Sequence, residues 1–191
     1  MGMSNMTLGL FGGFIFVPLP QMLAAQGVPE IKIAAISAAC LSPGFWVFLL
    51  GPMLDIRFTR RFYATLFAAL AGIGLMTAVL MRGHLLTLEI LLMIAYAASV
   101  LSSNALGGWL AGVIPDVAES DGDNPNHEGA RLSAWTQVGL FLGNGLMAGL
   151  AAEGMRRLPL TIIAPLLGAL VVLPAAVFPW IPVPELSLIH I

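Results

Sequence analysis

Long apolar blocks separated by short polar breaks run through most of this sequence. Of the 191 residues, 59% are hydrophobic and 9% are charged, whereas a soluble domain carries about 25% charged residues. A helix needs about 20 apolar residues to cross the hydrocarbon core of a bilayer, and several blocks reach that length. No block alternates apolar and polar residues, as the strands of a membrane β-barrel do. The sequence therefore predicts an all-α membrane protein.

Six of these blocks are predicted to be transmembrane helices. Their approximate ranges are 7–26, 33–54, 62–81, 87–112, 131–152 and 159–181. Short breaks place consecutive helices antiparallel, and the acidic, Asn/Gly/Pro-rich segment 115–129 is predicted to be the one long loop. Prolines inside the blocks are expected to kink or loosen the helices; they are Pro18, Pro20, Pro43, Pro165 and Pro174.

Residues 1–185 are interpreted as one transmembrane domain, and residues 186–191 as a non-native tail. The tail, Leu-Ser-Leu-Ile-His-Ile, resembles one reading frame of a transposon end used in sequencing libraries, and it is excluded from the fold as a tag would be. On this interpretation the native chain continues beyond residue 185, and a second half is missing.

Charge and cysteine usage exclude several functions. The net charge of −2 gives no support to nucleic acid or an acidic substrate as a partner. The single cysteine, Cys40, cannot form an intrachain disulfide. The acidic run from Asp121 to Asn124 lacks the spacing of a calcium loop. No metal or cofactor is predicted, and the expected partners are the lipid bilayer and a small solute.

Polar residues are unevenly distributed among the predicted helices. Gln21 lies in the first, Tyr96 and Asn104 in the fourth, and Gln137 and Asn144 in the fifth, whereas the third and sixth hold only isolated threonines. Amides in hydrocarbon are costly unless they face a partner or a water-filled cavity, while a threonine can bond to its own helix. The first, fourth and fifth helices are therefore predicted to surround a polar cavity, and the third and sixth to face lipid. Hydrogen bonding between packed helices is the alternative for each amide taken singly.

Two further patterns concern packing and protons. In the fifth helix, Gly139 and Gly143, and then Gly145 and Gly149, stand four residues apart, a spacing that lets helix backbones approach closely. No carboxylate lies deep in a predicted span. Glu89, near the start of the fourth helix, is therefore the candidate for any proton coupling within this chain.

The turn at residues 51–61 is charged and reads Gly51-Pro52-Met53-Leu54-Asp55-Ile56-Arg57-Phe58-Thr59-Arg60-Arg61. This stretch resembles the loop between helices 2 and 3 of the major facilitator superfamily. The superfamily pattern is Gly-x-Leu-x-Asp-Arg-x-Gly-Arg-Arg/Lys. Here Gly51, Asp55 and Arg60 match it in place, and Met53 substitutes for Leu. The pattern differs at Ile56, Phe58 and Thr59.

Other stretches extend the resemblance along the chain. Pro115 followed by Gly129-Ala130-Arg131 is similar to the superfamily's loop between helices 4 and 5. Within the superfamily, three stretches look most like the AmpG-like muropeptide and acetyl-CoA permease group. These are Pro18-Leu19-Pro20-Gln21, Gln26-Gly27-Val28 and Gly51-Pro52-Met53-Leu54-Asp55.

The resemblance implies the N-terminal six-helix half of a 12-helix secondary transporter, a permease that moves a small solute by alternating access. It implies a gate against the missing C-terminal half, formed by Gly51, Asp55, Arg57, Arg60 and Arg61. Positive charge does not set the orientation, because four Lys or Arg residues flank the helices on each side. Superfamily membership would place the 51–61 loop and both termini in the cytoplasm, with the protein in a bacterial inner membrane.

Two functions of other classes stay open at this point. One is a six-helix structural or assembly protein that works on its own. The other is a membrane-embedded enzyme, which is disfavoured because the sequence offers no nucleophile–base or metal constellation.

Overall fold

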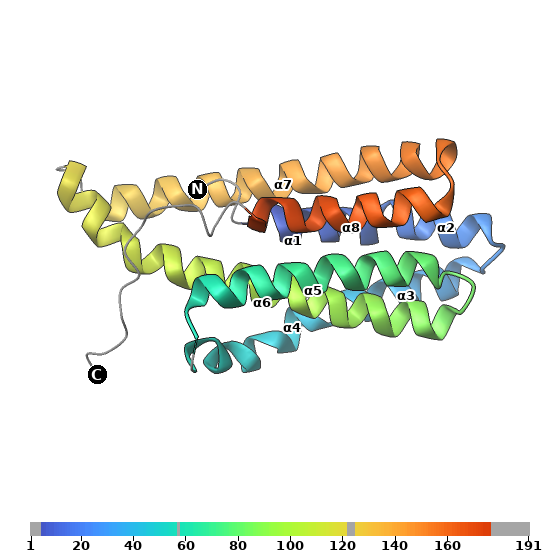
Figure 1. Ribbon diagram of the computed structural model, residues 1–191, viewed down its shortest axis with the longest axis horizontal. Coiled ribbons are helices and arrows are strands. Elements are labelled where there is room, and N and C mark those ends of the chain that lie inside the picture. The colour runs from blue at the N-terminus through green and yellow to red at the C-terminus, as the bar shows by residue number, and fades with distance from the viewer. Residues whose placement is uncertain (1–4, 57, 122–124, 177–191) are drawn as a thin grey trace.

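The computed structural model describes residues 5–56, 58–121 and 125–176, and throughout these ranges the regular structure is helical (Figure 1). Five helical segments of this part are long and apolar enough to cross a membrane: Met6–Ala25, Glu30–Leu54, Arg60–Leu80, Leu85–Leu110 and Gly129–Arg157. A shorter apolar helix, Leu160–Ala176, follows them. Residues 177–181 of the predicted sixth span lie outside the described residues, as does the 186–191 tail. Length and composition thus indicate an integral membrane protein built from α-helices.

The first two spans are each interrupted at a proline. The first span consists of α1 (Met6–Phe16) and α2 (Pro18–Ala25). The second consists of α3 (Glu30–Leu41), α4 (Pro43–Trp46) and the 3-10 helix η1 (Val47–Asp55). Pro18 and Pro43 begin α2 and α4, where a missing N–H removes no intrahelical bond. The predicted disturbance of the helices is confirmed at these two prolines, where it is a break between helices.

The remaining helices are α5 (Arg60–Leu80), α6 (Leu85–Asp121), α7 (Pro125–Arg157) and α8 (Leu160–Ala176). The predicted long loop over residues 115–129 is wrong, because α6 continues to Asp121 and α7 begins at Pro125. Once a helix leaves the hydrocarbon, polar residues do not prevent it from continuing, and Pro125 occupies a position that a helix start tolerates. The end of the α6–α7 hairpin projects beyond the other helices at the left of Figure 1.

The spans pack in a regular set of pairs. Counting spans along the chain, the first packs on the fifth (α1 with α7), and the second on the fourth (α3, α4 and η1 with α6). The third packs on the sixth (α5 with α8) and on the fourth (α5 with α6), and the first also packs on the sixth (α1 with α8). Consider an exchange of the first span with the fourth, the second with the fifth and the third with the sixth. This exchange converts the first–fifth pair into the second–fourth pair and the third–fourth pair into the first–sixth pair, and it leaves the third–sixth pair unchanged. In an up-down bundle the exchanged spans run antiparallel.

Glycines set the closest approaches between helices. A Cβ built on Gly72 of α5 would lie 2.5 Å from the carbonyl oxygen of Gly168 in α8, and one on Gly168 would lie 2.7 Å from that of Gly72. Between α1 and α7, a Cβ on Gly143 would lie 2.7 Å from the Met6 carbonyl oxygen. Cβ atoms on Gly145 and Gly149 would meet nothing within 4 Å. The predicted close packing is therefore confirmed at Gly143 and wrong, within this chain, at Gly145 and Gly149.

The outward faces of α5 and α8 are apolar. Ile73 of α5 and Leu166 of α8 are among their exposed side chains. The hydroxyls of Thr65 and Thr77 in α5 donate to carbonyls of their own helix three and four residues earlier. A threonine bonded in this way needs no partner on another helix, as predicted for the third span.

Candidate functional site

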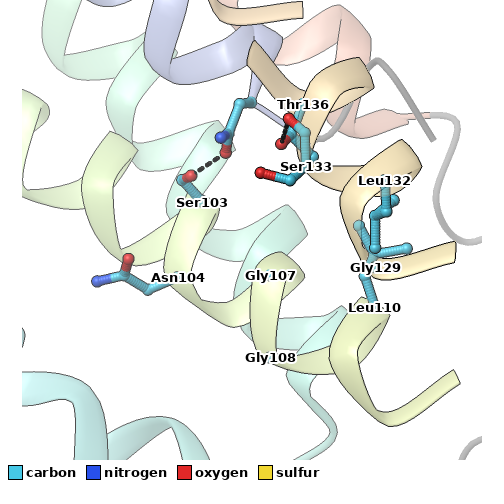
Figure 2. A pocket seen from close by; sticks show the side chains of 10 residues that line it. Ser103, Asn104, Gly107, Gly108, Leu110, Gly129, Leu132, Ser133 and Thr136 are labelled. Carbon is cyan, nitrogen blue, oxygen red and sulfur yellow. Dashed lines mark hydrogen bonds between the residues drawn. The ribbon is translucent and has the colours of Figure 1, made fainter. Parts of the chain in front are cut away.

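An open hollow of about 480 Å³ lies among the first, fourth and fifth spans (Figure 2). Asn5, immediately before α1, contributes to it, together with residues of α6 and the first turns of α7. The lining residues are Asn5, Ser103, Asn104, Gly107, Gly108, Leu110, Gly129, Leu132, Ser133 and Thr136. These residues occupy the ends of the three spans, so the hollow lies at one end of the bundle and not at its middle.

Hydroxyl and amide groups supply the polar surface of the hollow. The Ser103 hydroxyl donates to the Asn5 side-chain oxygen, which ties α6 to the residue that precedes α1 (Figure 2). The Thr136 hydroxyl donates to the Ser133 carbonyl oxygen at 2.7 Å. The side chains of Asn104 and Ser133 are exposed, so their polar groups are open to a solute.

Two glycines leave the backbone of the hollow uncovered. A Cβ built on Gly107 of α6 or on Gly129 of α7 would meet no atom within 4 Å. Gly129, Ser133 and Thr136 are spaced four and three residues apart, so they share one face of α7. Both α6 and α7 thus present accessible backbone as well as small polar side chains.

Two arginines at the start of α5 contact α6 beside the hollow. The Arg60 guanidinium lies where a side chain on Gly108 would otherwise stand. The Arg61 guanidinium carbon lies 5.1 Å from the centre of the Trp109 ring, within the range of a cation–π interaction. The 51–61 loop and the hollow are therefore at the same end of the bundle.

The other residues of the predicted gate are less closely associated with α6. Gly51 lies in η1, and a Cβ there would meet nothing within 4 Å, so no described helix uses it for close packing. Asp55 is the last residue of η1, but its side chain lies outside the described part of the structure. Arg57 lies outside the described residues altogether. Of the predicted gate residues, Arg60 and Arg61 thus contact α6, which is one of the helices that line the hollow.

Asn104 is the one predicted cavity residue that lines the hollow. Gln21 on α2 and Gln137 on α7 are exposed elsewhere. Tyr96 packs against Phe11 of α1, with 5.9 Å between the ring centres.

Asn144 lies in the contact between α1 and α7. Its amide nitrogen donates to the Leu140 carbonyl oxygen at 3.2 Å, and its side-chain oxygen would be 3.1 Å from a Cβ on Gly12. Asn144 therefore lies in a packed helix pair without the predicted hydrogen bond across it: its amide donates within α7, and its buried side-chain oxygen has no hydrogen-bond partner in the described structure. Tyr96 lies in the contact between α1 and α6.

Glu89 lies away from the hollow, near the other end of α6, and is half-buried. Its backbone carbonyl accepts a weak hydrogen bond from the Cys40 thiol of α3 at 3.9 Å. Among the residues that the structure describes, no three His, Cys, Asp or Glu side chains lie close enough together to hold a metal ion.

The sequence interpretation missed most of the lining residues. Asn5 precedes the predicted first span and was therefore not considered. A single serine or threonine, such as Ser133 or Thr136, does not by itself indicate a cavity. The available signal was the shared face of Gly129, Ser133 and Thr136, which becomes visible once this segment is taken as helix.

No protein-family model, curated protein or solved structure matches this chain. The function of this chain must therefore be inferred from its helix pairing and from the residues of the hollow.

Proposed function

We propose that this chain is the N-terminal six-helix half of a secondary transporter of the major facilitator type, which moves a small solute across the membrane by alternating access. One observation carries the proposal. Each half of such a transporter consists of two three-helix repeats in inverted orientation, and the span pairs here map onto one another under that exchange. The reciprocal contact of Gly72 with Gly168 lies between the third and sixth spans, which the exchange interchanges with each other.

The hollow supports the same proposal. Alternating access requires a path that opens to one side of the membrane at a time, and the substrate site of such transporters lies near the middle of the bilayer. A hollow at the end of the first, fourth and fifth spans fits the outer part of that path. The uncharged amide and hydroxyl groups of its wall can exchange hydrogen bonds with a passing solute.

The contacts of Arg60 and Arg61 suggest how a gate would work. They fasten the start of α5 to Gly108 and Trp109 of α6, so the 51–61 loop would move together with the wall of the hollow. Contact of this loop with the C-terminal half would close the path, and separation of the halves would open it. The proposal places the loop and both termini in the cytoplasm of a bacterial cell.

Transport by the full-length protein in lipid vesicles tests this function. Labelled sugars, amino acids and nucleosides are offered under an imposed proton or sodium gradient. We expect uptake of at least one, and a severalfold lower rate when Arg60 and Arg61 are both replaced by alanine, with insertion unchanged. Replacement of both Arg156 and Arg157 by alanine, at exposed positions in the last turn of α7 and away from the hollow, is the matched control. Uptake at the wild-type rate by the double variant would exclude the gating role, and a stable protein that moves no solute would favour a structural role.

A further inference from the structure

We infer that the hollow binds an uncharged solute rich in hydroxyl or amide groups. The inference rests on the proposed transport function and specifies the class of its substrate. It depends on three features of the hollow: the chemistry of its side chains, the direction of the nearby arginines and the open backbone at its glycines.

The described side chains of the lining carry hydrogen-bonding groups but no charge. Five of them are polar: Asn5, Ser103, Asn104, Ser133 and Thr136. Amide and hydroxyl side chains both donate and accept hydrogen bonds, so together they suit a solute whose groups do the same. An ionic solute would meet no opposite charge among the described residues of this wall.

The arginines beside the hollow do not supply that missing charge. The guanidinium of Arg60 lies against Gly108 on the side of α6 that packs on α5, and the guanidinium of Arg61 lies over the Trp109 ring. Neither arginine lines the hollow. Both cations therefore lie in the contact between α5 and α6, and the lining residues that the structure describes include no charged side chain.

The glycines allow a solute to approach the helices closely. Because a Cβ at Gly107 or Gly129 would extend into open space, a bound molecule can reach the backbone at both positions. Leu110 and Leu132 add apolar surface beside the polar groups. The volume of about 480 Å³ falls within the range of about 300–1,000 Å³ typical of small-molecule sites. A sugar-like molecule, with polar edges and apolar faces, matches this combination.

The chain lends itself to a thiol-protection experiment, because its one cysteine, Cys40, is buried. In a Cys40→Ala background, Ser133→Cys places a single reactive thiol in the wall of the hollow, and Thr136→Cys provides a second reporter. The full chain is reconstituted in lipid nanodiscs, and the rate of alkylation by a soluble maleimide is measured. Glucose, inositol and gluconamide serve as neutral probes, and gluconate and glucosamine as an anion and a cation of similar size.

We expect at least one neutral probe to slow alkylation severalfold and saturably, with gluconate and glucosamine giving much weaker protection. Gly107→Val, which fills part of the hollow, should abolish the protection without changing the thermal stability. His84→Cys, at an exposed position between α5 and α6 and outside the hollow, is the control reporter, and its alkylation should not respond to any probe.

Protection by the charged probes alone, or by no probe at either reporter, would overturn the inference. The experiment measures binding, so it separates the inference from the proposed function. Saturable protection in a protein that moves no solute would overturn transport but leave the site intact. Transport of an ionic solute would overturn the inference alone.

Discussion

Gly108 is the residue at which the predicted gate and the hollow meet. It lines the hollow through its backbone, and the space beside it holds the Arg60 guanidinium. A Gly108→Ala change would displace that guanidinium, which is the end of a flexible side chain and can move at little cost. We therefore expect the free energy of unfolding to change by less than about 1 kcal/mol, while transport falls to the level of Arg60→Ala.

Uptake assays and thermal unfolding of the Gly108→Ala protein would check this expectation. Gly83→Ala is the control, because its Cβ would meet nothing within 4 Å and the residue lies in the α5–α6 connection, away from Arg60 and the hollow. Equal loss of transport in the two variants would show that the position of Arg60 is not the cause.

Gly143 is predicted to contribute to stability, not to transport. Its replacement by alanine would put a Cβ 2.7 Å from the Met6 carbonyl oxygen and 2.8 Å from the Leu10 amide nitrogen, so α1 and α7 would have to separate. We expect a loss of about 1–3 kcal/mol in the free energy of unfolding, as is typical of overpacking. Denaturant unfolding in micelles, followed by circular dichroism, measures it. Gly149→Ala should have little effect, and a comparable loss there would contradict the assignment.

The candidate site was predictable from the sequence only in outline. The uneven distribution of amides predicted a cavity among the first, fourth and fifth spans, and the hollow lies at one end of these spans. Of the predicted residues, Asn104 lines it and the other four do not. The rotation of each helix could not be predicted, because too few polar residues mark a face. Tyr96 and Asn144 therefore point into helix contacts, while Asn5 and Ser133 line the hollow.

At the scale of elements, α5 and α8 approach each other closely at one reciprocal contact within their packed interface. Gly72 and Gly168 each face the other's carbonyl oxygen, so a methyl group on either forces the same separation of the two helices. Gly72→Ala and Gly168→Ala should each lower the free energy of unfolding by about 1–3 kcal/mol. The double variant should lose less than the sum, since residues in contact are not additive.

A double-mutant cycle of unfolding free energies would measure this coupling. Gly83→Ala is a suitable control, because a Cβ at Gly83 meets nothing within 4 Å. Strict additivity would mean that the two glycines act through different contacts.

Helix boundaries show what the sequence does not determine at this scale. Pro18 and Pro43 begin new helices, whereas Pro165 and Pro174 lie inside α8. Membrane helices tolerate an internal proline where neighbouring groups satisfy the freed backbone, and those neighbours are known only after folding. The polar segment 115–129 was predicted to be a loop, but most of it is helical. Polar residues are compatible with a helix that extends outside the bilayer, so their presence does not mark the end of the helix.

For the whole molecule, the apolar blocks fixed the class and the approximate spans, but the pairing of those spans was not predictable. The blocks are too similar in composition to choose partners. The selection depends on where small residues face one another, as Gly72 faces Gly168 and Gly143 faces α1. The symmetry of the contacts between spans is therefore visible only in the three-dimensional structure.

The orientation of the whole molecule in the membrane can be measured directly. The connections α2–α3, α5–α6 and α7–α8 share one end of the bundle, and the η1–α5 and α6–α7 connections share the other (Figure 1). In a Cys40→Ala background, His84→Cys and Phe58→Cys place exposed thiols at opposite ends. Because the proposed function puts the 51–61 loop in the cytoplasm, an impermeant maleimide added to intact cells should label only His84→Cys. Phe58→Cys should react after permeabilisation. The reverse pattern would overturn the cytoplasmic gate but keep the bundle, whereas labelling of both from one side would contradict the antiparallel arrangement on which the pairing of the spans depends.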